Sequence, residues 1–330
     1  MEEIRIHEKI FINIGNTRQG MFIVGESINN PVLLFLHGGP GMPTFFLEKQ
    51  YPTGLEQHFT VCYWEQTGGG ISFSPEILPE EMSIERIVTD AIEITKYLRQ
   101  RFGKEKIYLM GHSWGSLIGI LTSAKAPDLF EAYIGVAQIT NQSESEKLAF
   151  KYMLDKYTEA GNKAMISKFG SYNLENGKEE IIRFFKSPLR DKTMHELGIG
   201  TMRGMRSVIT GVFIPFMTSK HYTITERINL WRAKMFLLNK TKLIEELFNH
   251  DLPVEFPKLP IPVYFLSGIH DFTVNYELSR EYLKNIDAPV RGFYSFDASA
   301  HSPMHEEPMR FIHLLKNDVI ERKNSLANPN

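Results

Sequence analysis

The stretch "IYLMGHSWGSLIGI", residues 107–120, puts Ser113 between two glycines, where one apolar run ends and another begins. The first run is typical of a buried strand and the second of a helix. A Gly-x-Ser-x-Gly pattern at a strand-to-helix junction predicts a nucleophile elbow, a sharp turn that strains the serine backbone. Only small residues two positions either side let strand and helix pass so closely. The stretch therefore predicts a Ser113 hydroxyl exposed beside the unpaired N–H groups of a helix N-terminus.

Strands and helices alternate on both sides of this stretch. Alternating and β-branched runs predict strands at 4–14, 20–25, 32–37, 59–65, 106–111, 131–137, 262–268 and 290–296. One helix is expected between Ser83, which can cap its start, and Gly103, which can end it. Further helices are expected at 114–126, near 275–286 and near 304–321.

The segment from about 140 to 256 interrupts this alternation. It is rich in helix formers and methionine and shows no strand pattern. We therefore expect an α/β fold with a mostly parallel central sheet flanked by helices, and a helical cap inserted after the sixth strand. The core domain would comprise 1–139 and 257–330, and the cap 140–256. The tail "NSLANPN", 324–330, is expected to be disordered.

Composition narrows the class of partner. The 330 residues carry a formal net charge of -2 with a pI near 6.6, so there is no overall basic field to hold nucleic acid or an anionic membrane. A small-molecule or short-peptide substrate is expected, and the oligomeric state is left open. The charged start "MEEIRIHEKI" and the absence of a long apolar run favour a cytoplasmic protein. The single cysteine, Cys62, fits a reducing compartment and a buried strand position.

A serine hydroxyl becomes a nucleophile only when a base takes its proton, and the base needs an orienting carboxylate. In this type of sheet both should follow the last strands, in the order Ser, acid, His. Asp271 comes directly after the strand 262–268, and His301 directly after the strand 290–296. We therefore predict a triad of Ser113, His301 and Asp271.

Three nearby residues compete for these roles. Asp297 sits at the same strand end as the histidine and could be the carboxylate, although it could equally cap the loop. His305 and His270 compete with His301, but the first falls in the last predicted helix and the second neighbours the acid. The assignment to Asp271 and His301 is preferred on position.

Acyl transfer also requires hydrogen-bond donors for the developing oxyanion. The elbow supplies the backbone N–H of Trp114, and the loop "HGGPG", 37–41, can supply that of Gly39. The alternative for this loop is a Pro-Gly turn after a strand. Neither metal nor organic cofactor is expected, since no metal-ligand spacing stands out and "TGGGIS", 67–72, lacks the Lys-Ser/Thr of a phosphate-binding loop.

With these motifs assembled, the chain resembles the α/β-hydrolase superfamily and, within it, the proline iminopeptidase-like serine peptidases. The resemblance implies a serine hydrolase that works through an acyl-enzyme and releases an N-terminal proline or small apolar residue. It is imperfect in "EQTGGGIS", 65–72, which matches the family stretch Asp-Gln-Arg-Gly-x-Gly-x-Ser. Here Glu65 replaces the aspartate and Thr67 the arginine, so a salt bridge to that arginine is not expected.

The cap departs further from the resemblance, which implies carboxylates next to a tryptophan that hold the substrate's free amine. In "INLWRAKMF" the residue after Trp231 is Arg232, which has the wrong charge for that task. Glu226, Glu245 or Glu246 could serve instead, or each could be a solvated helix residue.

Candidate substrate contacts come from the cap and from the glycine loop. The apolar run "SVITGVFIPFM", 207–217, could line a pocket or pack the cap on the sheet. The candidate substrate-binding residues are Gly38, Trp231, Phe213 and Phe216. The alternatives are a carboxylesterase for small apolar acyl esters and, from another class, a non-catalytic ligand receptor with the same fold.

Overall fold

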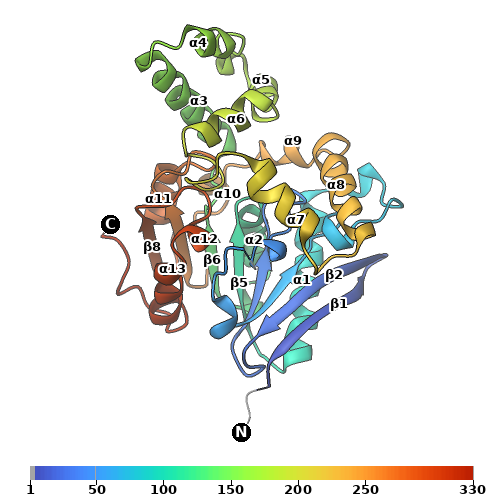
Figure 1. Cartoon of the computed structure of the whole chain (residues 1–330). Coiled ribbons are helices and arrows are strands. Elements are labelled where there is room, and N and C mark those ends of the chain that lie inside the picture. Colours follow the sequence, from blue (N-terminus) through green and yellow to red (C-terminus); the bar gives the residue numbers. More distant parts are fainter. Residues whose placement is uncertain (1–3, 49, 330) are drawn as a thin grey trace.

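An eight-stranded sheet forms the centre of the computed structural model, which describes residues 4–48 and 50–329 (Figure 1). The strands lie in the order β1-β2-β4-β3-β5-β6-β7-β8. Their bounds are β1 (Ile6–Ile14), β2 (Thr17–Gly25), β3 (Val32–Leu36), β4 (Thr60–Trp64), β5 (Ile107–His112), β6 (Phe130–Val136), β7 (Val263–Gly268) and β8 (Arg291–Phe296). Only the β1–β2 and β2–β4 pairs are antiparallel, which confirms the predicted mostly parallel sheet.

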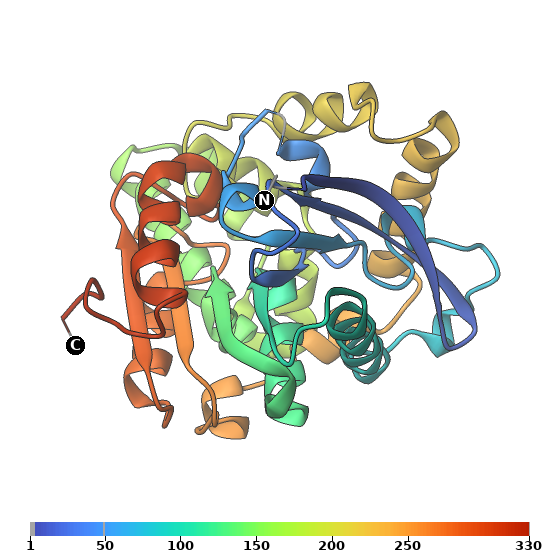
Figure 2. The ribbon, with the colours of Figure 1, turned by 90° about the horizontal axis from the view of Figure 1, so that it is seen from below.

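Helices cover both faces of the sheet (Figure 2). On one face pack α1 (Ile84–Phe102), α2 (Trp114–Lys125) and α11 (Tyr276–Asn285); on the other pack the C-terminal α12 (Pro303–Glu306) and α13 (Pro308–Leu314), continued by the π-helical turn η8 (Leu315–Val319). All residues of β3, β4, β5 and β7 are buried, which explains their unbroken apolar runs. Ser83 and Gly103 bound α1 as predicted: the Ser83 hydroxyl accepts from Arg86 N, and Gly103 has φ 61°.

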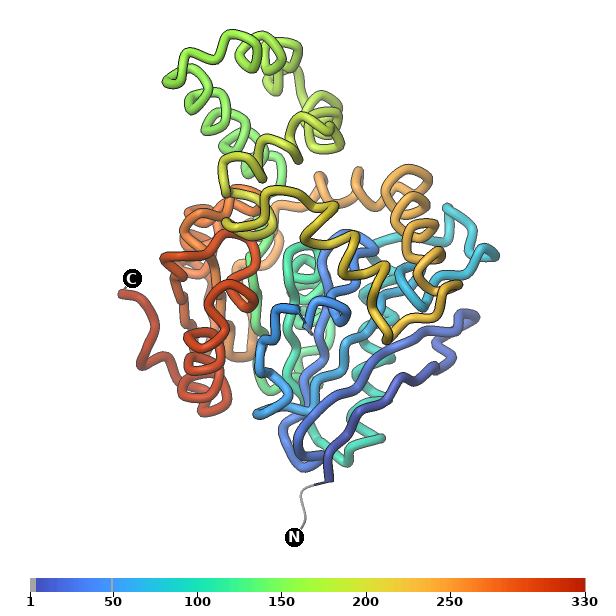
Figure 3. Tube along the Cα trace, viewed as in Figure 1, coloured from blue at the N-terminus to red at the C-terminus, as the bar shows by residue number. Residues whose placement is uncertain are grey.

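The secondary-structure elements that the structure describes between β6 and β7 are helices and helical turns joined by loops, and we call this segment the cap. Its elements are α3 (Gln142–Glu159), α4 (Lys163–Phe169), α5 (Lys178–Phe185), α6 (Pro188–Glu196), the π-helical turn η7 (Ile209–Phe213), α7 (Ile214–Thr218), α8 (Ile224–Asn239), α9 (Leu243–Leu247) and α10 (Leu252–Glu255). Helices α3 to α6 project as a lobe, whereas α7 and α8 lie across the body (Figure 3). Within the described ranges, no helix is long and apolar enough to cross a membrane.

Short 3₁₀ turns fill several connections: η1 (Phe45–Leu47), η2 (Leu55–Gln57), η3 (Gly70–Ser72), η4 (Pro79–Glu81), η5 (Pro127–Leu129) and η6 (Leu174–Asn176). The first of these follows the glycine loop 37–41 and packs in the core beneath the cap, where the Phe46 ring meets Phe216 of α7 at 5.1 Å. The loop is thereby held between the sheet and the cap.

Two expectations at the C-terminus were wrong. The continuous helix near 304–321 is broken at Glu307 (φ −130°, ψ 57°), because a proline at 308 disfavours helical geometry in the preceding residue. The tail is not disordered up to residue 329. Asn328 N donates to Phe293 O (2.8 Å) and Ser295 N donates to Asn328 Oδ1 (2.7 Å), so the tail satisfies the open edge of β8.

Candidate active site

Ser113 occupies a strained turn between β5 and α2. Its φ of 55° and ψ of −123° lie outside the regions that non-glycine residues normally adopt. A Cβ added at Gly115 would stand 2.1 Å from Leu36 O, and one added at Gly111 would stand 2.3 Å from Gly115 O. Both positions therefore have to be glycine. Ser113 itself is half-buried, whereas both its neighbours are buried.

His301 and Asp271 form a buried pair. His301 Nδ1 donates to Asp271 Oδ2 at 2.8 Å, and the Asp271 side chain is fully buried. The other oxygen, Oδ1, accepts from the backbone N–H groups of Thr273 (2.9 Å) and Val274 (3.0 Å). Because the carboxylate can only accept, the bond fixes the proton on Nδ1 and leaves Nε2 with a free lone pair.

The loop that carries His301 lies against the elbow. His112 Nε2 donates to His301 O at 2.9 Å, and the two rings are 4.9 Å apart. Burial lowers the pKa of His112 well below its usual value, so this histidine is neutral. Within residues 4–48 and 50–329, the Ser113 hydroxyl makes no hydrogen bond, neither to His301 Nε2 nor to another group. In enzymes without substrate, catalytic hydrogen bonds are often long and tighten only when the substrate binds.

The glycine loop meets the elbow from the other side. A Cβ added at Gly38 would lie 3.3 Å from Ser113 Cβ, and Gly39 has φ 124°. Among the described residues, no acceptor takes the backbone N–H of Gly39 or of Trp114. Two candidate donors thus flank Ser113, the arrangement expected of an oxyanion hole.

Gln66 links these two loops, a role that the sequence did not reveal. Its side-chain Nε2 donates to His37 O (2.8 Å), and its Oε1 accepts from Trp114 Nε1 (3.0 Å). Its backbone N–H donates to His37 Nε2 at 3.0 Å. Burial lowers the pKa of His37 to about 4, so this ring stays neutral and can accept. The only sequence signal was that Gln66 is retained in the "EQTGGGIS" stretch.

Glu65 and Thr67, the two residues of that stretch that differ from the family pattern, are both buried. Thr67 Oγ1 donates to Asp90 Oδ2 of α1 at 2.5 Å, so a hydroxyl takes the place of the family's arginine. Glu65 accepts from Ile71 N (2.6 Å) and from the Tyr222 hydroxyl, which comes from the cap. Burial raises the pKa of Glu65 to about 7. Glu65 therefore joins core and cap through a titratable carboxyl.

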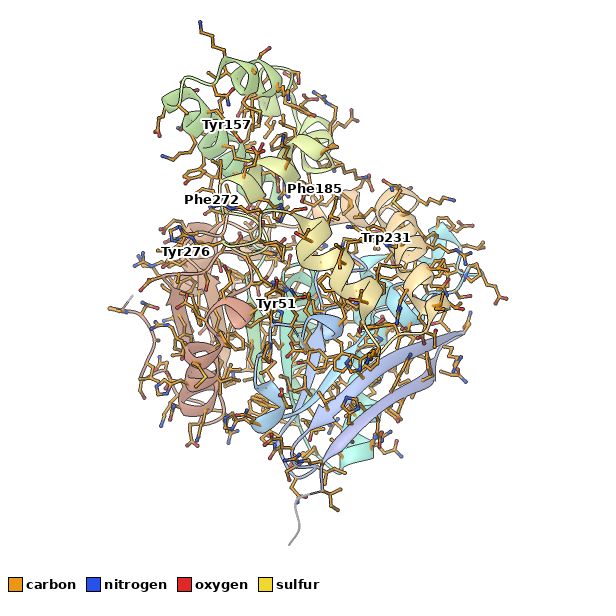
Figure 4. All side chains as sticks on the ribbon, in the orientation of Figure 1. Tyr51, Tyr157, Phe185, Trp231, Phe272 and Tyr276 are labelled. Atoms are coloured by element: carbon orange, nitrogen blue, oxygen red, sulfur yellow. The ribbon has the colours of Figure 1, made fainter. Side chains whose placement is uncertain are left out.

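The candidate cap residues lie in two environments. Phe213 and Trp231 have ring centroids 5.0 Å apart and are half-buried. Trp231, on α8, is labelled in Figure 4. Phe216 is 1% exposed, and its ring contacts those of Phe46 and Tyr222, each at 5.1 Å. Arg232 is exposed and lies 5.3 Å from the Phe73 ring.

The three cap glutamates considered for an amine already have partners. Glu226 Oε1 lies 2.5 Å from Lys9 Nζ, and Glu245 Oε1 lies 3.3 Å from Lys186 Nζ. Glu246 Oε2 accepts from Ile84 N at the start of α1 (2.7 Å). An ammonium ligand would have to share these carboxylates with the groups that they already bind.

The competing residues are placed elsewhere. His305 Nδ1 donates to Tyr51 O at 2.8 Å, and burial lowers the pKa of His305 to about 4. The Asp297 residue is exposed, and its carbonyl lies 3.2 Å from His270 Nε2. In the part of the chain that the structure describes, no group of three or more His, Cys, Asp or Glu is placed to hold a metal ion.

The chain is similar in sequence to known α/β hydrolases over most of its length. A family model described as "alpha/beta hydrolase fold" matches residues 31–308. "Probable aminopeptidase YbaC" of Bacillus subtilis (strain 168) is 33% identical over 314 residues, which cover 92% of this chain and 93% of that protein. "Proline iminopeptidase" of Lactobacillus delbrueckii subsp. lactis is 29% identical over 118 residues, 36% of this chain and 39% of that protein.

Solved structures share the fold at low sequence identity. VinJ superposes with a TM-score of 0.65 at 18% identity, covering 96% of this chain and 98% of that one. The proline iminopeptidase of Mycobacterium smegmatis gives 0.64 at 15% identity, covering 93% and 96%. These likenesses extend over nearly the whole chain, cap included.

Replacing the buried carboxylate should impair hydrolysis while leaving the fold intact. In Asp271→Asn the amide can present an N–H to His301 and favour the wrong tautomer, so kcat should fall by about 10⁴. Asp297→Asn, at the exposed competitor, is the matched control and should retain wild-type kcat. Equal losses in the two variants, with unchanged thermal unfolding, would contradict the assignment to Asp271.

Glu65 should leave a signature in the pH dependence of stability. Its raised pKa means that the folded state holds a proton that the unfolded state loses between about pH 4.5 and pH 7, so this stabilisation disappears as the pH rises. Glutamine does not titrate. Between about pH 4.5 and pH 8 the free energy of unfolding of Glu65→Gln should therefore gain about 3 kcal/mol relative to wild type.

Urea denaturation at the two pH values measures this shift. The exposed Glu76→Gln variant serves as the control, and its difference from wild type should be the same at both pH values. A constant difference for Glu65→Gln as well would mean that this carboxyl does not carry the raised pKa.

Proposed function

The chain belongs to the proline iminopeptidase-like family of α/β hydrolases, and on that basis we propose that it is an aminopeptidase with a Ser113-His301-Asp271 triad. Because the chain belongs to this family, it is a hydrolase and not the non-catalytic receptor that the sequence also allowed. The observation that carries the triad is the bonded Asp271–His301 pair on a loop that is hydrogen-bonded to the elbow of Ser113.

In this proposal His301 Nε2 removes the proton from Ser113 Oγ as the oxygen attacks the substrate carbonyl. Asp271 stabilises the imidazolium that forms. The N–H groups of Gly39 and Trp114 hold the oxyanion, and each such donor is worth about 3 to 4 kcal/mol where it has been measured in other enzymes. His301 then passes its proton to the leaving amine, and a water activated by the same base hydrolyses the acyl-enzyme.

The proposed substrate is a peptide with an N-terminal proline or another small apolar residue. Support comes from the relatives, which are named as an aminopeptidase and a proline iminopeptidase.

A carboxylesterase is the second candidate, and one observation favours it. Glu226, Glu245 and Glu246 are each engaged by other groups, which leaves the substrate amine without a dedicated partner among them. An apolar acyl ester needs no such partner.

A substrate panel separates the two candidates. We expect turnover of a prolyl arylamide that falls at least a hundredfold when the proline nitrogen is acetylated, because acetylation removes the charge that an aminopeptidase recognises. Short acyl esters provide the comparison, and Ser113→Ala provides the background rate. Ester turnover with no prolyl arylamide turnover would reject the aminopeptidase in favour of the esterase.

A further inference from the structure

Helix α8 presents an apolar face to solvent. Ile224, Ile228 and Met235 are 74%, 53% and 56% exposed. Together with the half-buried Trp231 they recur every three or four residues, so they lie on one side of the helix. The opposite side carries the buried residues Leu230, Ala233 and Leu237.

The neighbouring segment extends this face. The contact between Phe213 and Trp231 sets η7 and the start of α7 beside α8. There, Ile209 and Ile214 are 64% and 48% exposed. We call Ile209, Ile214, Ile224, Ile228 and Met235 the outer cap patch. They are five of the twelve large exposed apolar residues in the described ranges, yet they fall within 27 consecutive positions.

The same segment is strongly basic. Residues 200–242 contain eight lysines and arginines and one acidic residue, a net charge of +7, which leaves −9 for the rest of a chain whose net charge is −2. The one acid, Glu226, is paired with Lys9. Six of the cations are exposed: Arg203, Arg206, Lys220, Arg232, Lys240 and Lys242.

We propose that the outer cap patch docks on an anionic membrane surface. An apolar helical face in a segment that also carries six exposed cations matches such a surface in two ways. The isoleucines can enter the acyl boundary, and the cations can meet the headgroups. Helix α8 has only 16 residues, too few to span a bilayer, so it would lie in the plane of the interface.

The charge also argues against a second copy of this chain as the occupant. A symmetric dimer through the outer cap patch would bring two +7 segments together, and their repulsion would oppose the contact. An anionic bilayer reverses the sign of that interaction. The whole-chain charge, on which no membrane partner was expected, averages over this local asymmetry.

Docking at this face would leave the proposed active site clear. The inner side of α8 approaches the glycine loop, because a Cβ added at Gly41 would stand 2.5 Å from Leu237 Cδ1. The three residues of the outer cap patch that belong to α8, Ile224, Ile228 and Met235, lie on the other side of this helix. Membrane binding can therefore be measured independently of hydrolysis.

Co-sedimentation with vesicles tests the proposal on the full chain. Binding is expected to vesicles of equal phosphatidylcholine and phosphatidylglycerol, to weaken with added salt, and to be at least tenfold weaker with phosphatidylcholine alone. Ile224→Asp combined with Ile228→Asp should lower the affinity at least tenfold. Lys240→Gln combined with Lys242→Gln should lower it about tenfold or more, since one lysine near the surface is worth roughly fivefold.

Met309→Asp is the matched control, because Met309 is 84% exposed but lies on α13, outside the outer cap patch. It should bind as wild type does, and thermal unfolding checks that every variant is folded. Equal binding to both vesicle types, or equal loss in the control, would overturn the proposal. So would a dimer in light scattering that Ile224→Asp dissociates, since a second copy would then be the occupant.

Discussion

The close approach of helix α2 to the end of β3 is the constraint on which the rest of the site depends. Gly115 passes so near Leu36 O that no side chain fits, and Gly111 is equally closed by Gly115 O. This packing leaves Ser113 at φ 55°, a conformation that costs about 1 to 3 kcal/mol and persists only when its surroundings enforce it. The same approach brings the glycine loop that follows β3 alongside the serine.

Hydrogen bonds among buried polar groups then fix the glycine loop, the elbow and the His301 loop relative to one another. Gln66 joins the glycine loop to Trp114, and His112 joins the elbow to the His301 loop. Burial lowers the pKa of His37 and of His112 and keeps both rings neutral, which suits them to these structural roles. The backbone N–H groups that bind Asp271 Oδ1 hold the carboxylate so that its other oxygen points at His301.

The sequence predicted the parts of this arrangement that follow from topology. Asp271 and His301 could be paired because the carboxyl ends of neighbouring parallel strands gather at one edge of a sheet, and β7 and β8 are neighbours. Ser83 and Gly103 were readable as helix ends because capping is local. Gln66 was not readable as a bridge, since its partners lie 29 and 48 positions away.

The net charge of −2 for the whole chain gives no indication of the basic segment 200–242. Which side of α8 faces solvent could be determined only from the folded structure. Labelling by a fluorophosphonate tests the central claim most directly, because the reagent reacts with a serine only where a base and an oxyanion site activate it. We expect one adduct, on Ser113, that is absent in Ser113→Ala and forms much more slowly in His301→Gln. Folded wild-type protein that remains unlabelled, or that is labelled at another residue, would contradict it.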